Sequence, residues 1–162
     1  MKKKKVLVLG ATGQDGSFIC KFLVKKNFDV YALVRKSATG NLGNLKELIN
    51  HPNFKIRHGD LLDLISIEKT IREIKPNEIY NFADQDHVRW SFEVPTYSFD
   101  VTGSSVVKLL EIIKNHSPKS KFFQPLSSNI FGDTKKKKTK RRREIFPLKY
   151  LCFRKSHRLL RM

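Results

Sequence analysis

Three glycines follow the first apolar run of the chain, in the segment GATGQDG at residues 10–16. The run before them, KVLVL at residues 5–9, has the β-branched, apolar character of a buried parallel strand. A plain turn needs one glycine. Further glycines let the backbone approach a pyrophosphate closely and let the following helix pack near the strand. Because the N-terminus of that helix offers free N–H groups to phosphate, the segment predicts a dinucleotide-binding strand–turn–helix unit.

Strand and helix patterns alternate along the rest of the chain. The helix after the glycines places Phe18, Ile19, Phe22 and Leu23 at helical spacing, and Asn27 is its expected stop. Further strands are expected at residues 28–36, 54–60, 78–83 and 121–127, and helices at residues 45–50, 64–74 and 102–116. This order predicts an α/β fold, a Rossmann-type doubly wound parallel sheet with helices on both faces, over residues 1–133.

The basic residues are unevenly distributed. The net charge is +18, and residues 134–162 hold 13 of the 33 Lys and Arg residues but one of the 15 acidic residues. Because the body of the chain is not uniformly basic, nucleic acid is not an expected partner. The segment 134–162 is expected to be an irregular, disordered basic tail.

Cysteine usage and hydropathy indicate the compartment. Cys20 and Cys152 lie far apart without metal-ligand spacing, so neither a metal site nor a disulfide framework is expected. No stretch approaches the roughly 18 apolar residues of a membrane helix. We expect a cytoplasmic protein that does not enter a membrane.

The end of the second expected strand bears on which dinucleotide binds. NAD sites usually place Asp or Glu there for the ribose 2′-hydroxyl, whereas a 2′-phosphate requires a cation. Here the strand ends with Arg35 and Lys36 and has no carboxylate. A guanidinium can hold a phosphate through two hydrogen bonds. The pattern favours NADP over NAD, although a solvated basic turn would also explain it.

Several segments resemble the extended short-chain dehydrogenase/reductase family. They are GATGQDGSFICKFL, LVRKS, HGDLLD, KPNEIYNFADQDHVRWSFEVPTYSFDV and FFQPLSSNIFG, which together extend from about Lys4 to Gly132. Within that family they are most similar to the GDP-mannose 4,6-dehydratases. The resemblance implies a nucleotide-sugar substrate and tightly held NADP that oxidises the sugar at C4. Water is then eliminated across C5–C6 and hydride returns to C6. It also allows a homo-oligomer.

The resemblance assigns residues to the cofactor and to catalysis. The phosphate loop comprises Gly10, Ala11, Thr12, Gly13, Gln14, Asp15 and Gly16. The residues expected near the 2′-phosphate, the adenine and the rest of the cofactor are Arg35, Lys36, Ser37, Asp60, Leu61, Phe82, Ala83, Gln85, Asp86 and Tyr97. Ser127 is expected to donate a hydrogen bond to the C4 oxygen.

Asn129 departs from the family pattern, which has glutamate at this position. An amide cannot take the C5 proton, as a carboxylate would. A nucleotide-sugar epimerase or ketoreductase of the same family, which tolerates a non-acidic residue better, is therefore an open alternative.

The tail also departs from the family, because the expected Tyr-x-x-x-Lys helix is missing. Tyr150 is followed four and five residues later by Arg154 and Lys155. One permitted back-translation of this region, read one nucleotide later, contains Tyr-x-x-x-Lys. We interpret the tail as an out-of-frame translation that begins near the lysine run at 135–138, after the NADP-binding half of an enzyme. The alternative is a basic arm that binds nucleic acid or serves as a localisation signal.

Overall fold

The computed structural model describes residues 3–38 and 40–126. Within them the chain divides into two compact units, one containing residues 3–84 and 107–124, the other residues 85–106 with 125 and 126. Ser127, Asn129 and the basic tail expected from residue 134 lie outside the described residues.

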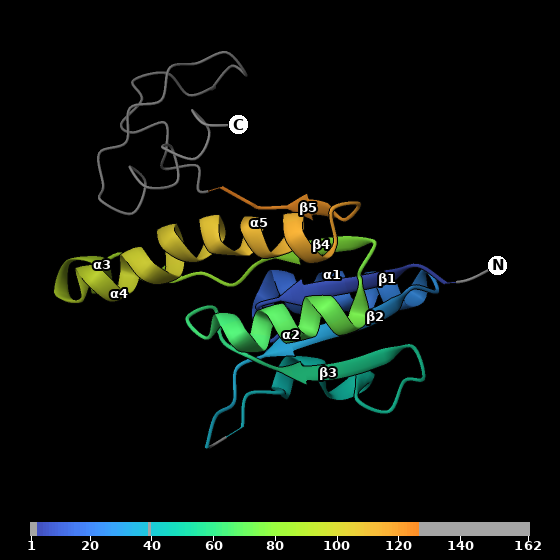
Figure 1. Cartoon of the computed structure of the whole chain (residues 1–162). Helices are drawn as coiled ribbons and strands as arrows, with labels where there is room; N and C mark the ends of the chain where they lie inside the picture. The colour runs from blue at the N-terminus through green and yellow to red at the C-terminus, as the bar shows by residue number, and fades with distance from the viewer. Residues whose placement is uncertain (1–2, 39, 127–162) are drawn as a thin grey trace, which may run out of the picture. The chain divides into compact units, whose positions relative to one another are not determined.

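The first unit is built on a five-stranded parallel sheet (Figure 1). Its strands are β1 (Lys5–Leu9), β2 (Asp29–Val34), β3 (Phe54–His58), β4 (Glu78–Asn81) and β5 (Lys121–Phe123), in the order β3-β2-β1-β4-β5. The sheet order reverses at β1, whose Val8 pairs with Ala32 on one side and Tyr80 on the other. Parallel strands reach the same edge with their carboxyl ends, and ligands of such sheets bind where the order reverses. The predicted Rossmann-type α/β fold is confirmed.

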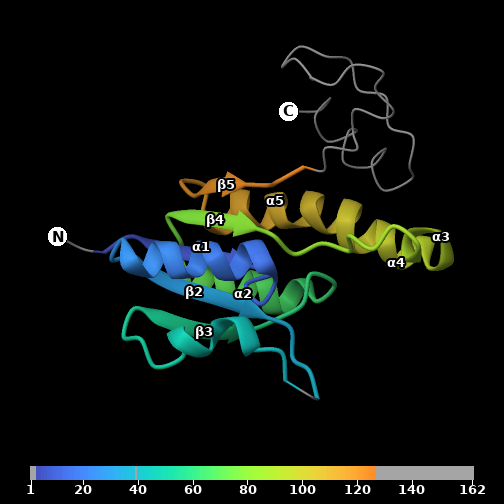
Figure 2. The same ribbon diagram turned by 180° about the vertical axis from the view of Figure 1, so that it is seen from behind.

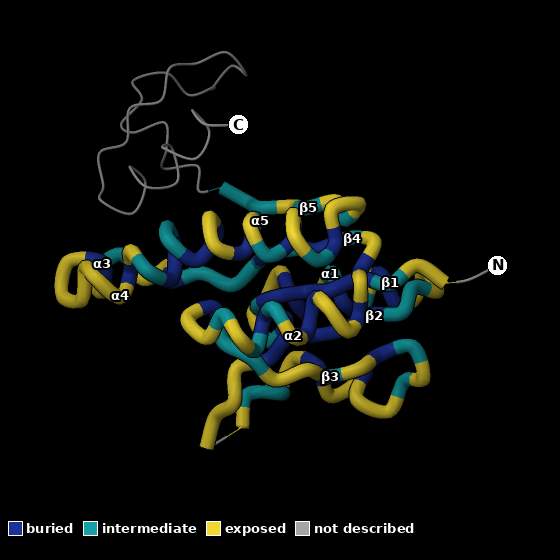
Figure 3. The backbone as a smooth tube through the Cα atoms, viewed as in Figure 1, coloured by how far each residue is buried: buried dark blue, intermediate teal, exposed yellow. Residues whose placement is uncertain are grey.

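Helices cover both faces of the sheet. One face carries α1 (Gln14–Lys25) and the 3₁₀ helix η1 (Gly43–Leu48), seen in front in Figure 2. The other face carries α2 (Leu64–Ile74) and the part of α5 (Ser105–His116) that belongs to the first unit. Strands β1 and β2 are buried along nearly their whole length (Figure 3), as expected for strands covered on both sides.

The caps of α2 are those its sequence calls for. The side chain of Asp63 accepts a hydrogen bond from the Ser66 N–H at the N-terminus. Lys75 adopts a left-handed conformation after the last turn, and Pro76 follows it. Helix α1 ends similarly, because Asn27, the predicted stop, has φ of 63°.

The apolar face predicted for α1 is only partly right. Phe18 and Phe22 are 63% and 53% exposed, whereas Leu23 is buried as expected. The buried face comprises Gly16, Ser17, Cys20, Leu23 and Val24. Its small residues let the helix axis approach the sheet, and this turns the two phenylalanines toward solvent.

Other differences concern the type and length of elements. The helix expected at residues 45–50 is the six-residue 3₁₀ helix η1, a form that is frequent in short connectors. The helix expected from Thr102 starts with the π-helical segment η2 (Asp100–Ser104), and α5 follows it. The four strands after β1 end two to four residues earlier than expected, so the residues after them form loops.

The second unit contains two short helices that the sequence patterns did not predict. These are α3 (Trp90–Glu93) and α4 (Pro95–Phe99), with Pro95 at the first turn of α4. The buried amide of Gln85 joins the start of the unit to α4 by donating to Ser98 Oγ at 2.9 Å. No helix in the described part of the chain combines the length and apolar character needed to cross a membrane.

Candidate cofactor site

The turn after β1 contains three glycines in three different environments. Gly10 has φ of +72°, and a Cβ there would lie 2.5 Å from the Ala83 backbone nitrogen. A Cβ on Gly16 would lie 2.2 Å from the Gly10 carbonyl oxygen. For Gly13, by contrast, the nearest neighbour within the described residues is Gly10 O at 3.3 Å. Packing inside the protein therefore requires glycine at 10 and 16, whereas a Cβ on Gly13 would make a tight contact that a small shift can relieve.

The N-terminus of α1 is suited to bind an anion. Gly13 occupies the N-cap position, and no side chain of the described residues caps it. The first N–H groups of a helix have no carbonyl partner within the helix, and the helix dipole places a partial positive charge there. Gln14 and Asp15 are exposed, while Ala11 is buried. Because Gly13 is also exposed, this end of the helix fits a pyrophosphate.

The cationic segment, residues 35–37, follows the last residue of β2. Arg35, Lys36 and Ser37 are all exposed. Because Leu9 and Leu33 are register partners, the segment and the glycine turn leave the same edge of the sheet from neighbouring strands. The side chain of Asn41 donates to the Arg35 carbonyl at 3.3 Å. The end of β2 therefore presents positive charge beside the phosphate loop.

Asp60 and Leu61 follow β3 at the same edge. The Asp60 carboxylate accepts the Leu62 N–H at 2.9 Å, so it shapes its own turn. Leu61 is 7% exposed and contributes its side chain to the core.

The carboxyl end of β4 is organised by Asn81, to which the sequence patterns assigned no role. This residue is fully buried, donates to Gln124 Oε1 at 2.7 Å and accepts the Ala83 N–H at 3.2 Å. The Phe82 N–H donates to the Leu9 carbonyl at 3.0 Å, which holds the loop against β1. The one feature of the sequence that could have indicated this role of Asn81 is a polar residue at the end of a buried strand.

The remaining predicted cofactor residues, Gln85, Asp86 and Tyr97, belong to the second unit. Gln85 uses both atoms of its amide inside that unit: Nε2 donates to Ser98, and Oε1 accepts the His87 N–H at 2.7 Å. Asp86 is exposed, and Tyr97 is 39% exposed on α4.

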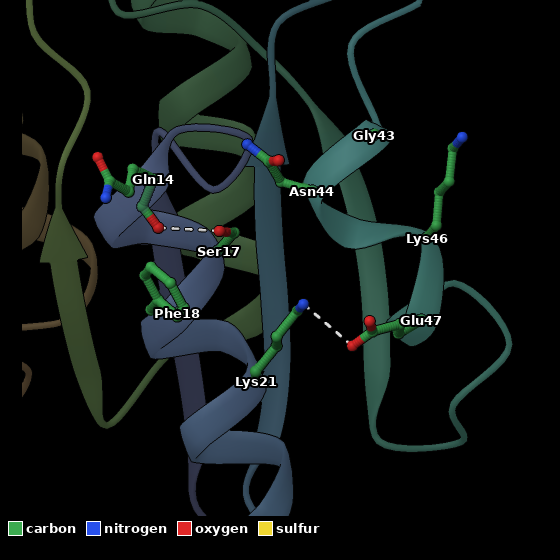
Figure 4. Close-up of a pocket in the computed structure, with 8 residues that line it drawn as sticks. All are labelled: Gln14, Ser17, Phe18, Lys21, Gly43, Asn44, Lys46 and Glu47. Carbon is green, nitrogen blue, oxygen red and sulfur yellow. Dashed lines mark hydrogen bonds and ion pairs between the residues drawn. The ribbon is translucent and has the colours of Figure 1, made fainter.

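A cleft of about 550 Å³ lies between α1 and η1 (Figure 4). Its lining residues are Gln14, Ser17, Phe18, Lys21, Gly43, Asn44, Lys46 and Glu47. Gln14 and Asn44 lie at its end nearest the glycine turn, where the Asn44 side chain donates to the Thr12 carbonyl at 2.8 Å. Further along, Lys21 and Glu47 form an ion pair of 3.0 Å across it. Sequence patterns did not predict this cleft.

Two side chains of the first unit have displaced pKa values. Burial raises the pKa of the Cys20 thiol to about 12. Burial, and then the hydrogen bond from its hydroxyl to Glu78 at 2.9 Å, raise the pKa of Tyr80. Both groups therefore stay neutral at physiological pH, and neither lies on the phosphate loop.

The sequence profile of the GDP-mannose 4,6-dehydratase family matches residues 7–149. The chain belongs to this family. GDP-mannose 4,6-dehydratase 1 of Arabidopsis thaliana is 38% identical over 142 residues, which cover 82% of this chain and 39% of the relative. The Cricetulus griseus GDP-mannose 4,6-dehydratase is 36% identical and is covered to 41%. The chain thus spans about 40% of the length of these curated relatives.

A solved structure of an epimerase shares the fold. The UDP-glucose 4-epimerase of Thermus thermophilus, determined in complex with NAD, has a TM-score of 0.81 and is 25% identical. The similarity covers 96% of this chain and 50% of the epimerase.

Proposed function

We propose that this chain binds NADP and supplies the cofactor-binding part of a nucleotide-sugar dehydratase that acts on GDP-mannose. The observation that carries the proposal is the glycine turn, in which Gly13 is exposed at the N-terminus of α1 while the protein itself requires glycine at positions 10 and 16. The relatives in the family are named for GDP-mannose, and they support this choice of substrate.

The choice of NADP rests on the charge at the end of β2. Arg35 and Lys36 are exposed beside the phosphate loop, and the sequence has no acidic residue between Asp29 and Glu47. A 2′-phosphate would gain charge-assisted hydrogen bonds there, while NAD would find no carboxylate for its 2′-hydroxyl. When bound, NADP supplies the hydride acceptor and donor for oxidation at C4 and reduction at C6 of the sugar.

Binding measurements on the full chain test this choice. We expect NADP to bind about tenfold or more tightly than NAD by calorimetry. Arg35→Ala should weaken NADP about 10- to 100-fold, since hydrogen bonds to charged groups contribute about 1.5–3 kcal/mol, and should change NAD little. Lys69→Ala, an exposed lysine on α2, is the matched control. Equal affinity for NADP and NAD in the parent protein would overturn the assignment.

A nucleotide-sugar epimerase or ketoreductase is the second candidate, favoured by Asn129 at the position of the family's glutamate. We expect no dehydration of GDP-mannose by this chain, because no Tyr-x-x-x-Lys spacing follows Gly132. Measurable formation of the 4-dehydro-6-deoxy product with NADP would contradict this expectation.

We also propose that the protein resides in a reducing compartment such as the cytoplasm.

We further propose that the protein self-associates. Trp90, Phe92 and Phe99 are 52%, 65% and 47% exposed within the second unit, and exposed apolar side chains of this kind are typical of contacts between proteins. Sedimentation velocity over a range of concentrations tests self-association, and a constant monomer would refute it.

A further inference from the structure

Two asparagines hold the segment that connects β2 with η1. Asn41 donates to the carbonyl of Arg35 at 3.3 Å, close to the start of the segment. Asn44, the second residue of η1, donates to the carbonyl of Thr12 at 2.8 Å across 32 residues of sequence. Together the two bonds attach the chain at the start of η1 to the Arg35 carbonyl and to the phosphate loop.

The atom that Asn44 contacts belongs to a well-defined peptide group. The Thr12 carbonyl and the Gly13 N–H form one planar unit, and this N–H donates to the Gly10 carbonyl at 3.1 Å. The loop keeps its shape through that bond and through the packing of Gly16 on Gly10. What Asn44 adds is a fixed spacing between the loop and the chain that follows β2.

The fold does not depend on this contact. Leu45 and Leu48 anchor η1 in the core at 0% and 7% exposure. The ion pair between Lys21 and Glu47 also joins η1 to α1. Asn44 itself is exposed, so its removal leaves no buried polar group uncompensated in water.

We propose that Asn44 is a positioning residue for NADP recognition, which keeps the cationic segment at the distance from the phosphate loop that one dinucleotide spans. The inference rests on the proposed binding of NADP. A ligand that engages both places gains from their fixed spacing, because less ordering is left to occur on binding. A ligand that engages only one of them gains nothing from it.

Binding of three ligands to the full chain distinguishes a ligand that engages both places from one that engages a single place. NADP spans both places, NAD engages the phosphate loop without a 2′-phosphate, and adenosine 2′-monophosphate engages the cationic segment alone. Asn44→Leu keeps the shape of the side chain and removes the donor. Lys21→Met, which removes the ion pair between α1 and η1 and leaves the contact with the phosphate loop, is the matched control. Dissociation constants are measured by NMR titration, and Tm by calorimetry.

We expect Asn44→Leu to raise the Kd of NADP about three- to tenfold, the range for one lost hydrogen bond. The Kd values of NAD and of adenosine 2′-monophosphate should change less than about twofold, and Tm should stay within about 5 °C. Lys21→Met should leave all three constants unchanged. Should leucine lower Tm further, Asn44→Ser replaces it in the same measurements.

Two other outcomes would overturn the inference, and they can be told apart. Equal weakening of all three ligands, or no weakening of NADP, refutes the positioning role while NADP binding by the parent protein stands. A parent protein that binds neither NADP nor adenosine 2′-monophosphate refutes the proposed cofactor itself, and the role of Asn44 with it.

Discussion

Alanine at positions 13 and 16 should separate the two requirements for glycine in the turn after β1. The two glycines lie three residues apart and differ in what a methyl group would meet. At Gly16 the new Cβ would lie 2.2 Å from the Gly10 carbonyl oxygen and 2.9 Å from the Ala11 Cα. At Gly13 the nearest atom in the described chain is 3.3 Å away.

These distances set the magnitudes. Both atoms that oppose Cβ at Gly16 are backbone, so helix α1 would have to move away from the turn, at a cost of about 1–3 kcal/mol for an overfilled core. Gly13 has φ of −71° and ψ of 173°, which alanine adopts freely. The poorer N-cap and the tight contact with the Gly10 oxygen oppose the smaller entropy of the unfolded chain, so the free energy of unfolding should change by less than about 1 kcal/mol.

Affinity should show the opposite order. A methyl group at Gly13 would be added at the exposed N-cap where a pyrophosphate approaches the helix, and we expect the Kd of NADP to rise at least about tenfold, which corresponds to about 1.4 kcal/mol. Urea unfolding followed by circular dichroism gives the stabilities, and calorimetry gives the Kd. The reasoning is refuted if Gly13→Ala loses as much stability as Gly16→Ala, or if it binds NADP as tightly as the parent protein.

Three further changes test other parts of the first unit. Asp63→Ala removes the N-cap of α2 and should lower the free energy of unfolding by about 1 kcal/mol, whereas Lys69→Ala on the same helix should not; equal values would contradict the cap. Asn81→Leu leaves the Ala83 N–H and the Gln124 carbonyl without this partner and should lower the free energy of unfolding, measured in urea, by about 1–3 kcal/mol. An unchanged midpoint of urea unfolding would show that these hydrogen bonds are dispensable. Burial raises the pKa of Cys20 from 9.0 to about 12, so its stabilising contribution is complete below pH 9 and is lost as pH rises toward 12. Between pH 8 and 10.5 the free energy of unfolding of the parent protein should fall by about 2 kcal/mol more than that of Cys20→Ala. If the two free energies instead fall in parallel with pH, the prediction is wrong.

The parts of the site that could be predicted from the sequence are local. The glycine turn depends on seven consecutive residues, and each of its requirements is a property of one residue type at one position. The caps of α2 and the stop at Asn27 were predictable for the same reason. The alternation of strands and helices predicted the parallel sheet, because two parallel strands need a crossover connection between them.

The contacts that sequence patterns did not predict join distant parts of the chain. Asn44 meets Thr12 across 32 residues and Asn81 meets Gln124 across 43, and neither asparagine belongs to a motif with fixed spacing. The exposed Phe18 and Phe22 were misassigned because helical spacing identifies an apolar stripe without showing which stripe faces the sheet. The close approach of Gly16 to Gly10 fixes the rotation of α1, and with it the stripe of the helix that faces the sheet.

The arrangement of these contacts lets cofactor affinity be examined apart from catalysis. Gly10, Gly16, Asn44 and Asn81 all make their contacts within residues 3–84 and 107–124, the first unit. The catalytic assignments, in contrast, fall on residues from Ser127 onward. Substitutions that change NADP affinity through the first unit should therefore do so whether or not the chain turns over a sugar. A preference for NADP that depended on residues beyond 126 would show that the cationic segment after β2 does not select the cofactor.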